Sequence, residues 1–177
     1  MANLADVRDR LQPALLDRLT DDAPTSRTEG EDHRVMSKSQ LRQAVLRDLS
    51  WLFNAVQPLV RDAEAFPVLG GTVLNFGLPP MSGQLASSMH IGDLEKTIRQ
   101  AILRFEPRIL ADTLEVKALE SDSVLDTHNV IEFEIRGQLW AQPVPLEILL
   151  RTQLDLEAGQ VLVRDAAPIS MAKPLAT

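Results

Sequence analysis

A glutamate and an arginine flank a proline at Glu106-Pro107-Arg108, where a helical pattern gives way to a strand pattern. The ring of Pro107 restricts the backbone, so the carboxylate and the guanidinium would project in a fixed orientation. A planar guanidinium is suited to bidentate recognition of a charged group on another protein. The turn is therefore a candidate partner-binding site. The alternative is that the two charges face water or close a local salt bridge.

Trp140 is the second candidate for partner binding. It follows a predicted strand on the outward register and precedes the Pro143-Val144-Pro145 segment. Exposed indoles often anchor protein interfaces, because they bury a large apolar area and carry one donor. The sequence leaves open whether Trp140 meets a partner or covers the edge of its own sheet.

Glu106 could also be the acid of a glycosidase, with Asp112 or Glu115 as the second carboxylate. That chemistry needs two carboxyl groups about 5 to 9.5 Å apart with different pKa values. With 25 acidic residues in the chain, some pair of carboxylates will always lie close together. Aromatic residues make up only 4% of the chain and include no tyrosine, which leaves little to stack on sugars. We expect no catalytic residue.

Other patterns that could support chemistry are incomplete. Gly70-Gly71-Thr72 lacks the lysine and the spacing of a phosphate-binding loop, so it predicts a tight turn. Ser87, Ser88 and His90 are neighbours without an orienting acid or an oxyanion site, and are interpreted as loop and cap residues.

Metal and cofactor sites are not expected. The chain has no cysteine, so thiolate ligands, thiolate nucleophiles and disulfides are excluded. Its three histidines, His33, His90 and His128, are far apart and show no paired helical spacing.

The composition is that of an ordinary globular domain, with 45% apolar and 24% charged residues in 177. A net charge of −7 opposes binding to nucleic acid, which depends on neutralising phosphates. No apolar run is long enough to span a bilayer, and the first eleven residues do not form a signal-peptide core. We therefore expect a cytosolic protein without direct membrane insertion.

Helical periodicity appears three times in the first 105 residues. The spacing predicts a helix over 3–19 that Pro13 kinks or restarts, a second from a cap at Ser37 or Ser39 to Pro58, and a third over 90–105. Pro107 disfavours helical geometry at Glu106 and so ends the third helix. The first helix carries an apolar stripe that must bury against something: Leu4, Val7, Leu11, Leu15 and Leu19. The stripes expected to face the core are Leu41, Val45, Leu49, Leu52 and Val56, and Ile91, Leu94, Ile98, Ile102 and Phe105.

After residue 110 the apolar period changes to two, which is typical of half-buried strands. Strands are predicted near 114–118, over 131–139 and 146–156, and over 160–164 after a turn at Glu157-Ala158-Gly159. Between the second and third helices, residues 66–80 form a short apolar segment held between glycine and proline turns. Helices followed by an antiparallel sheet indicate the α+β class.

The chain divides into three parts. Residues 1–36 are expected to be an N-terminal helix and a flexible linker, because 20–36 carry almost no apolar side chains. Residues 37–165 form the single α+β domain, and 166–177 a loose tail. The N-terminal apolar stripe either packs on its own domain or is offered to another protein as a helix.

Several segments together resemble one family, the TssE component of bacterial type VI secretion baseplates, which is similar to a wedge protein of contractile-tail phages. Phe66 and Phe76 stand where that family has tyrosine, and Phe53 and Ala55 replace its leucine and threonine. The matching segments occur in order along most of the chain: Leu15-Leu16-Asp17-Arg18-Leu19; Val45 to Asn54; Phe66-Pro67-Val68 with Val73 to Pro79; Phe105-Glu106-Pro107-Arg108; and Phe133 to Pro145.

This resemblance implies a cytoplasmic structural subunit at the baseplate docked on the inner-membrane complex, without catalytic activity or cofactor. Its partners would be TssF, TssG and TssK of the wedge and TssB and TssC of the sheath. Glu106, Pro107, Arg108 and Trp140 would contact partners, and an exposed strand edge could pair with sheath strands. The rival hypothesis is a lysozyme-like enzyme that cleaves peptidoglycan with Glu106. We expect the fold to survive replacement of Glu106 or Arg108 by alanine, because a charge on a turn costs little to remove.

Overall fold

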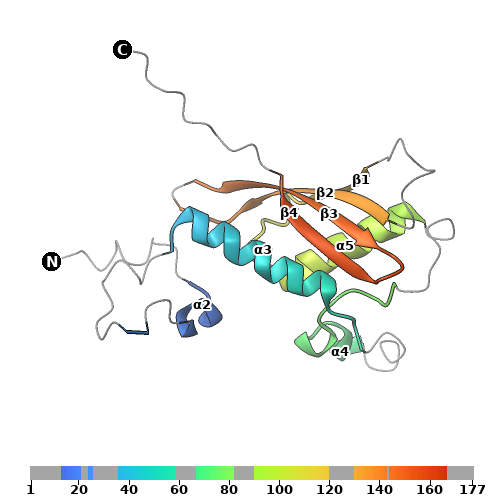
Figure 1. The fold of residues 1–177 in the computed structure, drawn as a ribbon, viewed down its shortest axis with the longest axis horizontal. Coiled ribbons are helices and arrows are strands. Elements are labelled where there is room, and N and C mark those ends of the chain that lie inside the picture. The colour runs from blue at the N-terminus through green and yellow to red at the C-terminus, as the bar shows by residue number, and fades with distance from the viewer. Residues whose placement is uncertain are drawn as a thin grey trace, which may run out of the picture.

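The computed structural model describes residues 13–20, 24–25, 36–58, 67–81, 90–119, 130–142 and 144–166. Within these ranges, helical segments come first and a four-stranded antiparallel sheet follows (Figure 1). The predicted α+β class is therefore confirmed. No helix in these ranges combines the length and the apolar composition that crossing a membrane requires.

The sheet is a meander in which each strand pairs with the next along the chain. Phe133 and Ile135 of β2 lie opposite Thr152 and Leu150 of β3, and all four are buried. The alternation in the sequence thus gives one apolar face and one polar face, as predicted. The strands are β1 (Glu115–Leu119), β2 (Val130–Leu139), β3 (Leu146–Asp155) and β4 (Gln160–Asp165).

Helices α3 (Lys38–Asn54) and α5 (Ile91–Phe105) both cover the apolar face of the sheet and leave the polar face open (Figure 1). The core lies between these layers and contains most of the second and third predicted helix stripes. Its fully buried side chains include Leu49 of α3, Ile102 of α5 and Phe133 of β2.

Helix α3 begins with a capping box. Ser37 accepts a hydrogen bond from the Gln40 amide, and the Gln40 side chain accepts one from the Ser37 amide. The predicted cap at Ser37 is confirmed. The helix ends at Asn54, before Pro58, so the prediction that Val56 belongs to its buried stripe was wrong. Val56 is exposed because the chain there leaves the helix and bridges Leu78.

Helix α5 ends at Phe105, and Glu106 is its C-terminal cap, as Pro107 predicted. Leu94, Ile98 and Ile102 are buried along its length. The prediction that Ile91 faces the core was wrong, because the first turn extends past the sheet and leaves Ile91 half exposed.

Residues 67–81 fold as α4 (Pro67–Gly70), a 3-10 turn η2 (Val73–Asn75) and an extended end. Gly77 has a φ of 124°, and a Cβ there would lie 2.3 Å from the Ala55 carbonyl oxygen. Only glycine fits this approach, which lets the Leu78 amide donate to Ala55 O at 2.8 Å. The segment is thereby joined to the end of α3.

Helix α2 (Leu15–Leu19) begins two residues after Pro13, where the pattern predicted a restart. Leu15 and Leu19 of the first apolar stripe are 72% and 74% exposed, so this end of the stripe does not pack on the described part of the domain. Met36, at the end of the predicted linker, is buried. The rest of the predicted first helix, most of the linker and the tail beyond Ala166 lie outside the described residues.

Candidate functional site

The turn that follows α5 buries the side chain of Glu106. The Glu106 amide continues the helix by donating to Ile102 O at 2.8 Å, and Ile109 N donates back to Glu106 O at 3.2 Å. This geometry leaves Pro107 exposed and Glu106 only 3% exposed. The predicted pair therefore does not project into solvent as two free charges.

Arg108 occupies both oxygens of the Glu106 carboxylate. Its Nε donates to Oε1 at 2.6 Å and its Nη2 to Oε2 at 2.5 Å, and its amide donates to Oε1 at 3.2 Å. This is a bidentate contact within the turn, the local salt bridge that the sequence left open as an alternative. Neither carboxylate oxygen is presented to a substrate.

Arg108 also ties the turn to α3. Its Nη2 lies 2.6 Å from Asp48 Oδ2, and Asp48 Oδ1 accepts from Arg47 Nε at 2.9 Å. Arg47 Nη1 in turn donates to Asp17 Oδ1 of α2 at 2.6 Å. We call these five residues, Glu106, Arg108, Asp48, Arg47 and Asp17, the charge chain. It connects three segments that are far apart in sequence.

The charge chain is less well satisfied at its α2 end. Arg47 Nη2 lies 2.8 Å from Asp48 Oδ1, close enough for an ion pair but without hydrogen-bond geometry, and Asp17 Oδ2 has no hydrogen-bond partner among the described residues. Arg47 also lies over the Trp51 ring, with 5.2 Å from its guanidinium carbon to the ring centroid. The part of the charge chain with the most complete hydrogen bonding is thus the link between Glu106, Arg108 and Asp48.

Both arginines have a raised pKa. Burial alone would lower the pKa of Arg108, but hydrogen bonds and charge from Glu106, and then from Asp48, outweigh it. The pKa of Arg47 is raised in the same way, with burial opposed by Asp17 and Asp48. Both guanidinium groups therefore stay charged throughout the physiological pH range.

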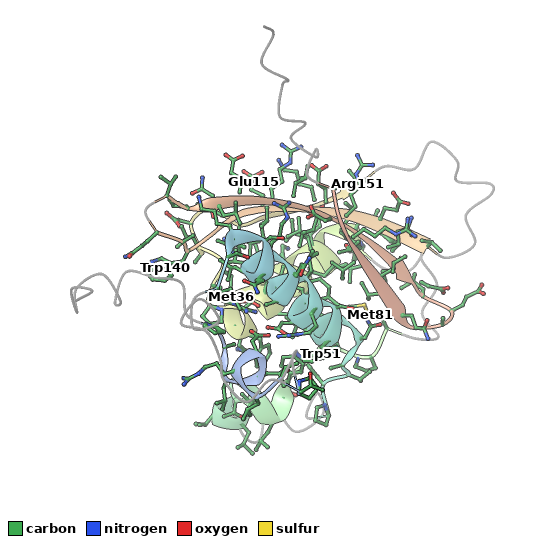
Figure 2. The ribbon with its side chains drawn as sticks, turned by 60° about the vertical axis from the view of Figure 1, so that its left-hand side comes forward. Met36, Trp51, Met81, Glu115, Trp140 and Arg151 are labelled. Atoms are coloured by element: carbon green, nitrogen blue, oxygen red, sulfur yellow. The ribbon has the colours of Figure 1, made fainter. Side chains whose placement is uncertain are left out.

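The turn and Trp140 are brought together by backbone pairing. Trp140 N donates to Arg108 O at 2.8 Å, Leu110 N donates to Gln138 O at 2.8 Å, and Ile109 bridges Leu139 between them. Trp140 is 53% exposed, at one end of the sheet (Figure 2). The two predicted partner-binding features thus form one surface, which we call the turn–tryptophan surface: Pro107, Arg108 and Trp140, with Glu106 beneath it.

The other candidates for catalysis do not assemble around Glu106. Asp112 and Glu115 are exposed, and Glu115 pairs with Lys117 at 3.1 Å. Gly70 is the last residue of α4, and its carbonyl accepts from Arg104 at 2.7 Å. His33, Ser87, Ser88 and His128 lie outside the described residues. In the described ranges, no three His, Asp or Glu side chains are placed to hold a metal ion.

Helix side chains cap both edges of the sheet, a feature that sequence reasoning missed. Asn54 of α3 donates to Val161 O at 2.8 Å and accepts from Val161 N at 2.9 Å, as a neighbouring strand would. On the other edge, Glu95 of α5 accepts from the Ala118 amide at 2.7 Å, and Arg99 donates to Leu114 O at 3.3 Å. The predicted open edge is therefore restricted, in line with the usual protection of edge strands.

Asp48, Arg47 and Asn54 were also missed as members of the site. All three lie in the segment that carried the family resemblance, yet helical periodicity marks them only as polar positions of α3. The motif was a signal that these residues matter, and it did not show which groups they contact.

Comparison with known proteins identifies the family. The model of the baseplate wedge protein gp25 family matches residues 39–144, more than half of the chain. The matched range contains Asp48, Asn54, the turn and Trp140. No curated protein matches the chain.

Among solved structures, a Geobacter sulfurreducens protein provisionally described as a tail lysozyme is 14% identical. The match covers 75% of this chain and 100% of that one, with a TM-score of 0.42, a similarity too low to carry an activity over. The family match, which spans most of α3, all of α5, β1 and β2 and the turn–tryptophan surface, shows that the chain belongs to the baseplate wedge protein gp25 family.

Proposed function

We propose that this chain is the structural subunit of a type VI secretion baseplate that links the TssF, TssG and TssK wedge to the TssB and TssC sheath. It acts in the cytoplasm, at the baseplate docked on the inner-membrane complex, and has no enzymatic activity. Family membership supports the baseplate role. The type VI assignment rests on the resemblance of the sequence motifs.

The observation that carries the proposal is the construction of the turn–tryptophan surface. Pro107 and Trp140 expose apolar area, and Arg108 beneath them is held by two carboxylates, with 25% of its side chain exposed. A partner that docks here meets groups that are already ordered, so binding loses little side-chain entropy. Glu106, buried under this surface, positions the guanidinium of Arg108.

Strand pairing with the sheath is a second part of the proposal. Asn54 bonds to the backbone of Val161 and so blocks the β4 edge there. Val163 is the next residue of β4 whose backbone groups face away from β3. Because backbone groups alternate in direction along a paired strand, those of Val163 face the same open edge as those of Val161. A sheath strand that adds to this sheet would pair from Val163 onward, beyond the Asn54 cap.

The test of the main proposal compares two tryptophans with equal exposure. Trp140 and Trp51 are each 53% exposed, so replacing either by alanine removes a similar apolar area. We expect Trp140→Ala to melt like the wild type, to lose copurification with TssF and TssG, and to abolish labelled-TssB sheaths in cells. Trp51→Ala should preserve both. Normal sheaths with Trp140→Ala, or equal loss with Trp51→Ala, would contradict the proposal.

The absence of enzymatic activity is tested separately by the turbidity of purified cell walls. The wild type and Glu106→Gln should both leave turbidity unchanged, because Arg108 occupies both carboxylate oxygens. Clearing by the wild type that is lost in Glu106→Gln would restore the peptidoglycan-cleaving hypothesis.

A further inference from the structure

The open face of the sheet carries two arginines whose side chains have no counter-ion in the described part of the chain. Helices α3 and α5 lie on the other face (Figure 1), so no described element covers Arg151 of β3, seen on the open face in Figure 2, or Arg164 of β4, and both are exposed. The register places these two residues directly opposite each other. Like charges in this position repel and destabilise a strand pair.

Most other charged side chains on this face do have partners. Lys117 pairs with Glu115, Arg136 pairs with Glu134, and Asp155 accepts from two backbone amides of the following turn. The side chains of Arg151 and Arg164, in contrast, make no hydrogen bond or ion pair with any described residue. Among the described basic side chains of this face, the missing partner is therefore particular to the β3–β4 pair.

The two arginines border a shallow hollow whose carboxylates are already engaged. Glu132, Gln153, Asp165 and Ala166 complete its lining. Glu132 accepts from Gln153 Nε2 at 2.7 Å, and both oxygens of Asp165 accept from Arg42 of α3. The hollow thus offers two fork-shaped donors whose side chains form no ion pair with either of its carboxylates.

The chemistry that fits two adjacent guanidinium groups is a planar anion. An extended polyanion is a poor fit, because Glu132 and Asp165 flank the hollow and the chain carries a net charge of −7. Leu162, on the same face two residues before Arg164, is 46% exposed. An acidic residue with apolar neighbours would meet both the charge and the leucine.

We propose that Arg151 and Arg164 form a docking site for a carboxylate side chain in an acidic, leucine-containing segment of another protein. The carboxylate supplies the counter-charge that the β3–β4 pair lacks and removes the repulsion between the two guanidinium groups. Leu162 gives the partner's apolar side chain a contact beside it. The inference does not rest on the proposed function, since the site is on the open face and not on the turn–tryptophan surface.

The test uses the full chain with ¹⁵N-labelled arginine and follows the side-chain Nε–Hε resonances. The probe is acetyl-Leu-Glu-Leu-amide, with acetyl-Leu-Gln-Leu-amide as the uncharged control and inorganic phosphate as the competing anion. We expect saturable shifts of Arg151 and Arg164 with the glutamate peptide only. Added salt should weaken them, because the contact is exposed and ionic.

The variants are Arg151→Gln and Arg164→Gln, with Arg136→Gln as a matched control on the same face. Loss of one charge-assisted contact should raise the Kd of the glutamate peptide roughly five- to ten-fold in the first two and leave it unchanged in the third. The melting temperatures of the first two should not fall below that of Arg136→Gln, because each substitution relieves a repulsion.

Several outcomes would overturn the inference. These are no saturable shift, equal shifts with the glutamine peptide, or equal weakening by Arg136→Gln. Phosphate binding tighter than peptide binding would reject a carboxylate partner. Peptide-independent shifts that grow with protein concentration would instead assign the site to a second copy of this chain.

Discussion

At the scale of single residues, Arg108 is where most of the contacts of the candidate site meet. It binds the buried Glu106 and reaches Asp48 of α3 with the same guanidinium. The expectation that a charge on this turn can be removed at little cost was made for an exposed pair. The buried pair leads to the opposite expectation, a clear loss of stability, because removing one partner of a buried ion pair leaves the other charge uncompensated.

We predict that Arg108→Ala lowers the free energy of unfolding by about 2–4 kcal/mol, measured by urea denaturation. Arg108→Lys should lose about half as much, since it keeps the charge but not the bidentate geometry. Arg136→Ala is the control, because its ion pair with Glu134 is exposed and worth at most about 1 kcal/mol. Equal losses for Arg108→Ala and Arg136→Ala would show that the turn pair is not a structural element.

Gly77 is a second residue whose identity is dictated by its surroundings. Gly77→Ala places a methyl group against the Ala55 carbonyl at a φ of 124° and should cost about 3 kcal/mol or more. Gly92→Ala is the matched control, because a Cβ there meets nothing within 4 Å. In helix α5 it should stabilise the protein by up to about 1 kcal/mol. Thermal melting of the two variants should therefore shift in opposite directions.

At the scale of elements, α3 is fixed along β4 at both ends. Arg42 holds Asp165 near the start of the helix, and Asn54 holds Val161 at its end. The helix thereby covers the core and closes part of the sheet edge. An edge capped in this way is protected against unspecific strand pairing.

We predict that Asn54→Ala costs about 1–2 kcal/mol and selectively exposes the Val161 amide to hydrogen exchange. Asn54→Asp should keep the Val161 amide protected, because the carboxylate still accepts from it, but should lose the bond to Val161 O. Hydrogen exchange followed by NMR separates the two variants. An unchanged exchange rate at Val161 in Asn54→Ala would mean that the side-chain cap contributes nothing.

At the scale of the whole molecule, the described core is contained in residues 36–166. Met36 at its start is buried, whereas α2 exposes Leu15 and Leu19 and contacts the core chiefly through the Asp17–Arg47 ion pair. The three-part division of the chain stays a prediction, with its first boundary moved to include Met36.

We predict that a chain starting at residue 35 still unfolds in one cooperative transition. It should lose no more than about 1 kcal/mol, the usual worth of a partly exposed ion pair. Asp17→Ala in the full chain is the control for that ion pair and should match the truncation, because it removes the contact with Arg47 and leaves the contact of Arg47 with Asp48 in place. A loss of cooperativity, or a much larger loss of stability, would show that the N-terminal part belongs to the domain.

The sequence by itself determined the order and type of the elements. The change of apolar period from about 3.6 to 2 predicted α5 and the four strands, and Ser37 and Pro107 marked helix ends, because these signals are local along the chain. Exceptions appeared where an element ended earlier or extended beyond the core, as at Val56, Ile91 and Leu15. The ordered motifs also indicated the family.

Only the tertiary structure decided what the functional side chains contact. Arg108 meets Asp48 from 60 residues away and Asn54 meets Val161 from 107 residues away, and no periodic pattern encodes such pairs. The packing of α3 against the apolar face of the sheet brings both pairs of residues into contact. Glu106 is the clearest case: its sequence position suggested a charge offered to a partner, and the fold turned it inward to hold Arg108 beside Trp140.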